Sequence, residues 1–225
     1  NVIKKVTNPI MKNAGFIVLS GNLFDSALMK TSVISKDFRR RFLSNTGEEN
    51  ILRAKAVVFE GPEDYHNRLN DPELKIDEKT ILFIRGVGCV GYPGSAEVVN
   101  MQPPDKLLKK GITHLPTVGD GRQSGTSESP SILNASPESV VGGGLAYLKT
   151  GDPVILDLNK GTLNADVAEK EWSSRIKKWK EPKIENQTPW QEIYRTNVGQ
   201  LADGGCLELA TAYKRIAKHL PRDNH

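Results

Sequence analysis

Thr80-Ile81-Leu82-Phe83-Ile84-Arg85-Gly86-Val87-Gly88 is the stretch of sequence that decides the fold class of this chain. A short apolar run that ends in glycine is typical of a buried β-strand followed by a turn. Two runs of the same kind precede it, at residues 16–19 and 56–59. The three runs predict three buried strands.

Strand signals continue on the C-terminal side of this stretch. Residues 145–148 and 154–158 are apolar and flank Gly151-Asp152, a dipeptide that favours a hairpin turn. Residues 115–118 predict a further short strand, which leads into a loop rich in glycine and hydroxyl groups. The middle of the chain is therefore expected to be rich in β-structure.

Helical patterns lie between and after the strands. Residues 48–55 and 62–69 have helical composition, and residues 104–110 begin with proline and are followed by glycine, as helices often are. Residues 169–180 are charged and predict a helix, and a last helix is expected to begin near Asp203. On that last helix, apolar residues that recur at helical spacing predict a buried stripe: Cys206, Leu209 or Ala210, Tyr213, Ile216 or Ala217, and Leu220.

Together these patterns predict a β-rich α/β fold. We expect a barrel-like domain with flanking helices at residues 1–167, and a helical C-terminal extension packed on it at residues 168–225.

The composition narrows the class of protein. The chain has 225 residues, of which 37% are hydrophobic and 26% charged, so it can bury a core and is expected to be a soluble globular protein. The net charge of +4 is modest, and no basic face with stacking aromatic residues is evident, which argues against nucleic-acid binding. No apolar run is long enough to cross a bilayer, so we expect no membrane contact.

The cysteines and the first residue bear on location. Two cysteines, Cys89 and Cys206, make no disulfide framework, which favours a reducing compartment, and both are expected to be buried. We therefore expect a cytoplasmic protein. Because the chain begins at Asn1, we expect a fragment or processed piece of a longer protein, so a mitochondrial targeting peptide stays open.

Two loops contain the residues that are best suited to chemistry. The first is Asp120-Gly121-Arg122-Gln123-Ser124-Gly125-Thr126-Ser127, in which Ser124 is a candidate nucleophile or base, or a hydroxyl that caps a turn. The second is Gly91-Tyr92-Pro93-Gly94-Ser95-Ala96-Glu97, in which Glu97 is a candidate ligand for a hard cation such as Mg²⁺, or a glutamate in the first turn of a helix. No complete catalytic set is visible.

Other residues of the first loop have weaker signals. Arg122, Gln123 and Thr126 have polar groups suited to a polar substrate, and Arg122 is equally suited to tying two loops together. Asp120 is a second candidate metal ligand, although aspartate before glycine is most often part of a turn.

Taken together, the loops resemble the C-terminal domain of the dihydroxy-acid and sugar-acid (phosphogluconate) dehydratase family. The resemblance covers nearly the whole chain and is strongest in these stretches: Ile84-Arg85-Gly86, Gly91 to Glu97, Leu115 to Thr126, Asn134-Ala135-Ser136-Pro137-Glu138 and Leu220-Pro221-Arg222-Asp223-Asn224-His225. The loop residues resemble those of the sugar-acid branch of the family, and within that branch they resemble L-arabinonate dehydratase most. Polar Gln123 and Thr126 suit a hydroxyl-rich substrate better than an isopropyl group.

The resemblance implies a fold and a reaction. The barrel would be a swivelling domain like that of the aconitase group, which closes over the site. The enzyme would be an iron–sulfur, magnesium-dependent hydro-lyase that removes water from a sugar acid and gives a 2-keto-3-deoxy acid.

The resemblance also implies roles for single residues. Glu97 would complete the magnesium site, Ser124 would be the alkoxide base, and Thr126 and His225 would contact substrate beside Arg122 and Gln123. The cluster-binding cysteines and most magnesium ligands would belong to a preceding N-terminal domain, which this chain lacks. We therefore expect the chain alone to be inactive, its partners being that domain, the sugar acid and further copies in a dimer or tetramer.

Three alternatives remain open at this point. One is the corresponding domain of a branched-chain dihydroxy-acid dehydratase. Another is the small swivelling subunit of an isomerase related to aconitase, which the loop around Ser124 disfavours. The third is a stand-alone, non-catalytic binding domain derived from the family.

Overall fold

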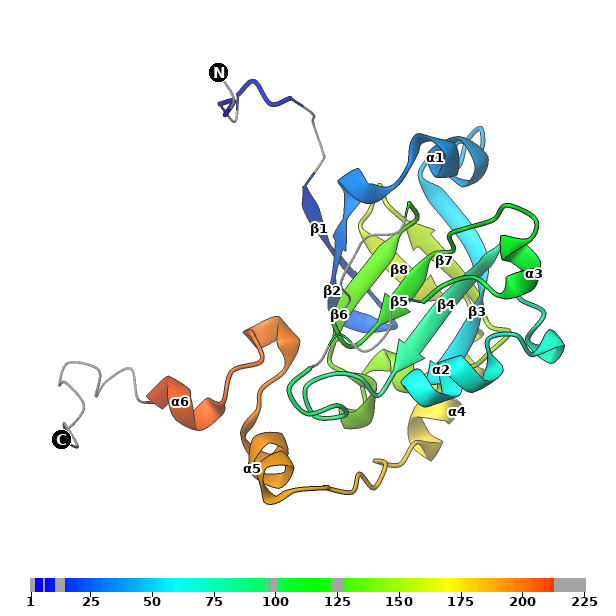
Figure 1. Cartoon of the computed structure of the whole chain (residues 1–225). Coiled ribbons are helices and arrows are strands. Elements are labelled where there is room, and N and C mark those ends of the chain that lie inside the picture. Colours follow the sequence, from blue (N-terminus) through cyan, green and yellow to red (C-terminus); the bar gives the residue numbers. More distant parts are fainter. Residues whose placement is uncertain are drawn as a thin grey trace.

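The strands close into a barrel, shown in Figure 1. The computed structural model describes residues 3–5, 7–10, 15–95, 97, 101–122 and 128–212. Within these residues the neighbouring order of the barrel strands is β1-β2-β6-β5-β4-β3-β7-β8. The strands are β1 (Phe16–Gly21), β2 (Phe24–Lys30), β3 (Ile51–Glu60), β4 (Thr80–Arg85), β5 (Thr117–Gly119), β6 (Ser131–Ser136), β7 (Pro153–Asp157) and β8 (Thr162–Ala165).

The parallel part of the barrel determines where its loops lie. β3, β4, β5 and β6 run parallel to one another, with Phe59 opposite Ile84 and Ile84 opposite Gly119. The carboxyl ends of these four strands therefore meet at one end of the barrel. The loops that follow β4 and β5 start there side by side.

Two apolar clusters explain why the deciding stretch is continuously hydrophobic. Ile81 and Phe83 of β4 point into the barrel and belong to the larger cluster. Leu82 and Ile84 point outward into a second cluster with Tyr65 of α2 and residues around α3. Because the strand is buried on both faces, it has no polar alternation. The prediction of a buried strand at residues 80–84 is confirmed.

Helices flank the barrel and follow it. The α-helices are α1 (Lys36–Phe42), α2 (Pro62–Arg68), α3 (Asp105–Leu108), α4 (Glu169–Lys178), α5 (Pro189–Asn197) and α6 (Glu208–Ala212). The 3₁₀-helices are η1 (Thr31–Val33), η2 (Pro72–Leu74), η3 (Ser139–Val141), η4 (Gly144–Tyr147) and η5 (Leu201–Asp203). None of the helices in the described ranges has the length and apolar character needed to cross a membrane.

The helical segment after the barrel follows a long path in Figure 1. α4 packs at the end of the barrel where α2 lies, and α5 and α6 lie beyond the loop that follows β4. β8 ends at Ala165 and α4 begins at Glu169. A mixed α/β fold with a closed β-barrel and several helices is therefore confirmed.

Three local predictions were wrong. Residues 51–55 belong to β3, because this segment pairs with β7 over its whole length, and that pairing overrides its helical composition. Residues 145–147 belong to η4 rather than to a strand, and this tight turn buries the side chains of Leu145 and Leu148. Cys206 is exposed and precedes α6, which begins only at Glu208. The rest of the expected stripe, at residues 213–220, lies outside the described residues.

Candidate functional site

The two loops expected to carry the chemistry lie side by side at the carboxyl ends of the parallel strands. Glu97 of the loop after β4 forms an isolated parallel bridge with Arg122 of the loop after β5. The Arg122 guanidinium also contacts the loop after β4, because Nε donates to the carbonyl of Ser95 and Nη2 lies 3.5 Å from the carbonyl of Gly94. Arg122 therefore ties the two loops together, which was one of its two predicted roles.

Glu97 is the candidate metal ligand that the structure describes. Its side chain is exposed, and it is held at the end of a turn by its bridge to Arg122. Among the residues that the structure describes, no group of three or more His, Cys, Asp or Glu side chains comes together to hold a metal ion. An exposed carboxylate of this kind fits one coordination position of Mg²⁺, which often takes few protein ligands. The described residues do not complete such a site.

Four predicted site residues lie outside the described residues. These are Gln123, Ser124, Thr126 and His225. Their predicted roles stay predictions. What the structure adds is the position of Arg122, which precedes Ser124 in the same loop and lies against the loop that carries Glu97.

Asp120 is a structural residue at the start of the loop after β5. Its side chain is fully buried, and Oδ1 accepts a hydrogen bond from the Val87 amide at 3.0 Å. Oδ2 accepts three more, from the Gly86 amide at 3.1 Å, the Ser139 amide at 2.9 Å and the Ser139 hydroxyl at 2.6 Å. Because both oxygens are occupied by the protein, Asp120 holds the loops in place and is not free to bind a metal.

Glu138 is a second buried carboxylate behind the same loop. It is 2% exposed, and its oxygens accept from the amides of Val90 and Gly91, each at 2.9 Å. Burial raises the pKa of Glu138, and the nearby Asp120 carboxylate adds to this effect, although the two amides act in the opposite direction. Asp120 and Glu138 therefore fix four backbone amides of the stretch that follows β4.

The loop backbones approach each other too closely for side chains at two glycines. A Cβ on Gly91 would lie 2.6 Å from the carbonyl oxygen of Gly86, and a Cβ on Gly121 would lie 2.5 Å from that of Val87. Backbone atoms cannot move aside cheaply, so these positions require glycine.

The C-terminal segment reaches the back of this site. Arg195 of α5 donates to the carbonyls of Val90 and Gly91, and Gln200 hydrogen-bonds Glu138. Cys89 is buried in the same loop, as expected, and accepts from the Ser95 hydroxyl at 2.8 Å. The sequence did not single out Arg195 or Gln200. Glu138 lay in a stretch that resembled the family, which was the one signal available for it.

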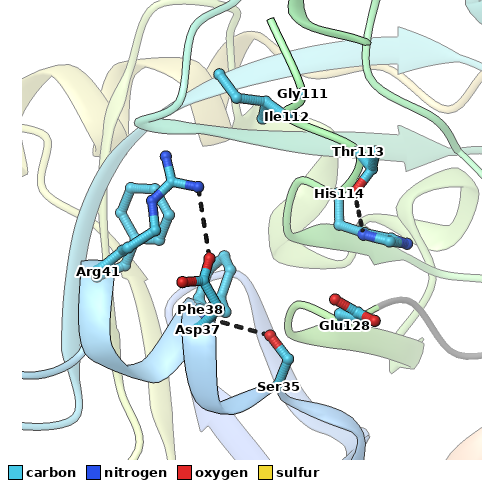
Figure 2. A pocket seen from close by; sticks show the side chains of 10 residues that line it. Ser35, Asp37, Phe38, Arg41, Gly111, Ile112, Thr113, His114 and Glu128 are labelled. Carbon is cyan, nitrogen blue, oxygen red and sulfur yellow. Dashed lines mark hydrogen bonds and ion pairs between the residues drawn. The ribbon is translucent and has the colours of Figure 1, made fainter.

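A different cavity, shown in Figure 2, lies at the opposite end of the parallel strands. His114 and Glu128 of its wall precede the amino ends of β5 and β6, and Asp37 and Arg41 come from α1. Its polar groups already serve local structure, since Ser35 caps α1 and Arg41 pairs with Asp37 at 3.7 Å. We do not assign a function to this cavity.

A family model and several known proteins match the chain. The family model described as "Dihydroxy-acid/6-phosphogluconate dehydratase C-terminal" matches residues 1–206. The chain is 57% identical over its whole length to a D-xylonate dehydratase of Caulobacter vibrioides, and it covers 38% of that protein.

Other relatives are more distant. An L-arabinonate dehydratase of Rhizobium leguminosarum bv. trifolii is 37% identical over 80% of the chain, which covers 29% of that protein. A dihydroxy-acid dehydratase of Methanobrevibacter smithii is 30% identical over 92% of the chain, which covers 35% of that protein. The expected likeness to the family and to its sugar-acid members is confirmed, with the D-xylonate enzyme more similar than the L-arabinonate enzyme. The chain spans less than two-fifths of the length of these relatives.

Proposed function

Because the chain belongs to the dihydroxy-acid/6-phosphogluconate dehydratase family, as a C-terminal part of it, we propose that it forms one half of the active site of a sugar-acid dehydratase. The observation that carries this proposal is the bridge between Glu97 and Arg122, since it brings the two loops together at one end of the barrel. The reaction is the loss of water from an aldonate to give a 2-keto-3-deoxy acid.

The proposed substrate class follows from the relatives. The name of the relative at 57% identity gives D-xylonate, and that of a relative at 37% gives L-arabinonate, both five-carbon aldonates. We therefore propose a five-carbon aldonate, with D-xylonate ahead of L-arabinonate. A branched-chain dihydroxy acid is the second candidate, supported by the relatives at 30% identity.

The chain's own residues have distinct proposed roles in this reaction. Ser124, as an alkoxide, takes the proton from C2 of the substrate, a C2–C3 double bond forms, and the C3 hydroxyl leaves as hydroxide. The proton that Ser124 has taken then passes to this hydroxide, which gives water and restores the alkoxide. The resulting enol then tautomerises to the ketone. Arg122, Gln123 and Thr126 hydrogen-bond the substrate hydroxyls and carboxylate, and His225 contributes a further contact.

The proposed cofactors lie between this chain and the rest of the enzyme. Glu97 would be one ligand of a magnesium ion, and an iron–sulfur cluster would be bound by the part of the protein that this chain does not contain. When bound, the two groups would supply Lewis-acid stabilisation of charge at the substrate carboxylate and at the leaving hydroxyl. The remaining ligands come from outside the described residues, so we propose that this chain alone does not turn over substrate.

The same proposal extends to the assembly. The barrel would act as a swivelling domain that closes over a preceding domain of the same cytoplasmic enzyme, and the enzyme would be a homo-oligomer. The family resemblance supports the swivelling motion and the oligomer, and the presence of only two cysteines supports the cytoplasmic location.

The proposal is tested with a chimera, in which this chain replaces the matching part of the D-xylonate dehydratase of Caulobacter vibrioides. We expect turnover of D-xylonate by the chimera and none by the chain alone. Ser124→Ala is expected to lower kcat by at least about 10³-fold, as loss of an essential proton acceptor does, while circular dichroism stays unchanged. Ser127→Ala, which removes a neighbouring hydroxyl, is the matched control.

The metal role of Glu97 is tested in the same chimera. Glu97→Gln is expected to raise the Mg²⁺ concentration for half-maximal activity by about 10–100-fold. If Ser124→Ala keeps normal activity, Ser124 is not the base. If Glu97→Gln leaves the Mg²⁺ requirement unchanged, Glu97 is not a metal ligand.

A further inference from the structure

We infer that Arg195 and Gln200, on the segment after the barrel, are positioning residues for Glu97. They hold the loop at residues 86–95 from behind, so that its end faces the loop that carries Ser124. This inference rests on the proposed role of Glu97 as a metal ligand, and it assigns a function to two residues that the proposed chemistry does not use.

The peptide group between Val90 and Gly91 is held at both of its polar atoms. Arg195 Nε donates to its carbonyl oxygen at 2.8 Å, and Glu138 Oε2 accepts from its N–H at 2.9 Å. A peptide group is planar, so fixing both atoms fixes its orientation. Glu138 also holds the Val90 amide, and Arg195 Nη2 lies 3.5 Å from the Gly91 carbonyl. Arg195 and Glu138 thus hydrogen-bond the loop backbone from two sides.

Gln200 keeps Glu138 in place. Its Nε2 donates to Glu138 Oε1 at 3.0 Å, and its Oε1 accepts from the Glu138 amide at 2.8 Å. The Gln200 side chain thus hydrogen-bonds both the carboxylate and the backbone amide of Glu138. Without Gln200, the buried carboxylate would lose the one side-chain donor that the described residues give it.

Arg195 is itself held in a fixed orientation. Its Nη1 donates to the carbonyl of Glu185 at 2.9 Å and to the side chain of Asn186. Arg195 is half-buried, and this burial lowers the pKa of its guanidinium. A half-buried guanidinium with several acceptors of fixed position is a more rigid contact than a single exposed hydrogen bond.

A hydrogen-bonded turn connects the peptide group at residues 90–91 to the end of the loop near Glu97. The Tyr92 amide donates to the Gly88 carbonyl at 2.8 Å, and the Ser95 amide donates to the Tyr92 carbonyl at 2.9 Å. The Ser95 hydroxyl bonds Cys89, and the Ser95 carbonyl accepts from Arg122. The turn is therefore held from the Arg195 contact as far as Ser95, and Arg122 joins Ser95 to the bridge with Glu97.

The first test measures backbone hydrogen exchange in this chain by NMR. We expect Arg195→Met to speed exchange of the Val90 and Gly91 amides by about tenfold or more, while amides of β3 and β4 stay protected. Lys183→Met, an exposed change of similar size on the same segment, is the control. Arg195→Lys keeps the charge but loses the planar fork, so an intermediate effect is expected.

The second test measures the Mg²⁺ requirement of the chimera described above. We expect Arg195→Met and Gln200→Leu to raise the Mg²⁺ concentration for half-maximal activity by about tenfold, with a much smaller change in kcat at saturating Mg²⁺. A residue that only stabilises the fold would not produce this split.

The outcomes separate this inference from the proposed function. If Glu97→Gln changes the Mg²⁺ requirement and Arg195→Met does not, the positioning role is wrong and the metal role stands. If Glu97→Gln changes nothing, the metal role fails, and the positioning role falls with it even where loop exchange responds to Arg195. Equal exchange in Arg195→Met and Lys183→Met also overturns the inference.

Discussion

At the scale of single residues, the site depends on two buried carboxylates, Asp120 and Glu138, whose partners are mostly backbone amides. They accept from the N–H groups of residues 86, 87, 90, 91 and 139. Backbone donors of this kind are costly to leave unpaired inside a protein. Small changes at these two positions are therefore expected to have large effects.

Asp120→Asn tests the first carboxylate without changing its shape. Since both oxygens of Asp120 accept hydrogen bonds, an amide NH₂ in either place faces an N–H donor. We expect a loss of about 2–4 kcal/mol in the free energy of unfolding, measured with urea. Asp25→Asn, on an exposed side chain, should change it by less than about 0.5 kcal/mol. Equal stability of the two variants would contradict the role given to Asp120.

The raised pKa of Glu138 predicts that the free energy of unfolding depends on pH. Burial raises its pKa in the folded protein above the ordinary value of 4.5, which the unfolded chain keeps. Between the two values the folded state binds more protons, so the free energy of unfolding falls as the pH rises. The contribution is complete below pH 4.5 and is lost as the pH passes the folded pKa.

The measurement is urea unfolding at a series of pH values from 4.5 upward, for the parent and for Glu138→Gln. Because glutamine does not titrate, the variant should lack this part of the fall. The difference in stability between the two proteins should therefore shift in favour of the variant as the pH rises. A constant difference across the series would show that the pKa of Glu138 is not raised.

Residue patterns predicted the loops but not what holds them. The glycines, Glu97 and Ser124 stand in contiguous stretches, so their likeness to the family was visible in the sequence. Glu138 and Arg195 contact Val90 from 48 and 105 residues away. Nothing local marks a residue whose partner is a distant backbone atom, so these contacts could not be predicted.

At the scale of elements, α4 is joined to the barrel by one partly buried ion pair and an aromatic contact. Arg175 binds Asp152 through two nitrogens at 2.5 and 3.0 Å, and their side chains are 12% and 11% exposed. The pair raises the pKa of Arg175, so the guanidinium stays charged. Trp172 of the same helix packs edge-on against Tyr147 with ring centroids 5.9 Å apart.

Arg175→Met leaves the Asp152 carboxylate without its partner in a partly buried position. We expect a loss of about 3–5 kcal/mol in the free energy of unfolding, since removing one member of such a pair strands the other charge. The double variant with Asp152→Asn should recover part of this loss. As a control, Arg40→Met breaks an exposed pair, with side chains 78% and 56% exposed, and should cost less than about 1 kcal/mol. Similar costs for the two pairs would refute the argument.

The elements that sequence predicted best were those whose pattern has one explanation. Residues 80–84 are apolar throughout because both faces of β4 are covered, and such a run is recognisable by itself. The first half of β3 was predicted to be a helix. Its side chains Arg53 and Lys55 point outward to ion pairs, and these charged residues give the strand a helical composition. Only its pairing with β7, about a hundred residues later in the chain, makes it a strand.

At the scale of the whole molecule, the barrel and the segment after it differ in how they are held. The barrel is closed, so each strand has neighbours on both sides, and most of its largest buried side chains form one cluster. α5 has no buried residue, and Trp190 on it is 76% exposed. From α5 onward the segment meets the barrel and its loops through a few groups, chiefly Arg195, Val198 and Gln200.

This difference predicts that α5 detaches before the barrel unfolds. Hydrogen exchange measured at increasing urea should show α5 amides losing protection at low denaturant, with a small dependence on urea because little surface is exposed. Amides of β3 and β4 should exchange together, only through global unfolding. The Val90 and Gly91 amides are expected to follow α5 rather than the strands, because Arg195 and Gln200 complete the contacts around them. If all these amides lost protection in one transition, the segment would be an integral part of the barrel's cooperative unit, and its hold on the loop could not be released separately.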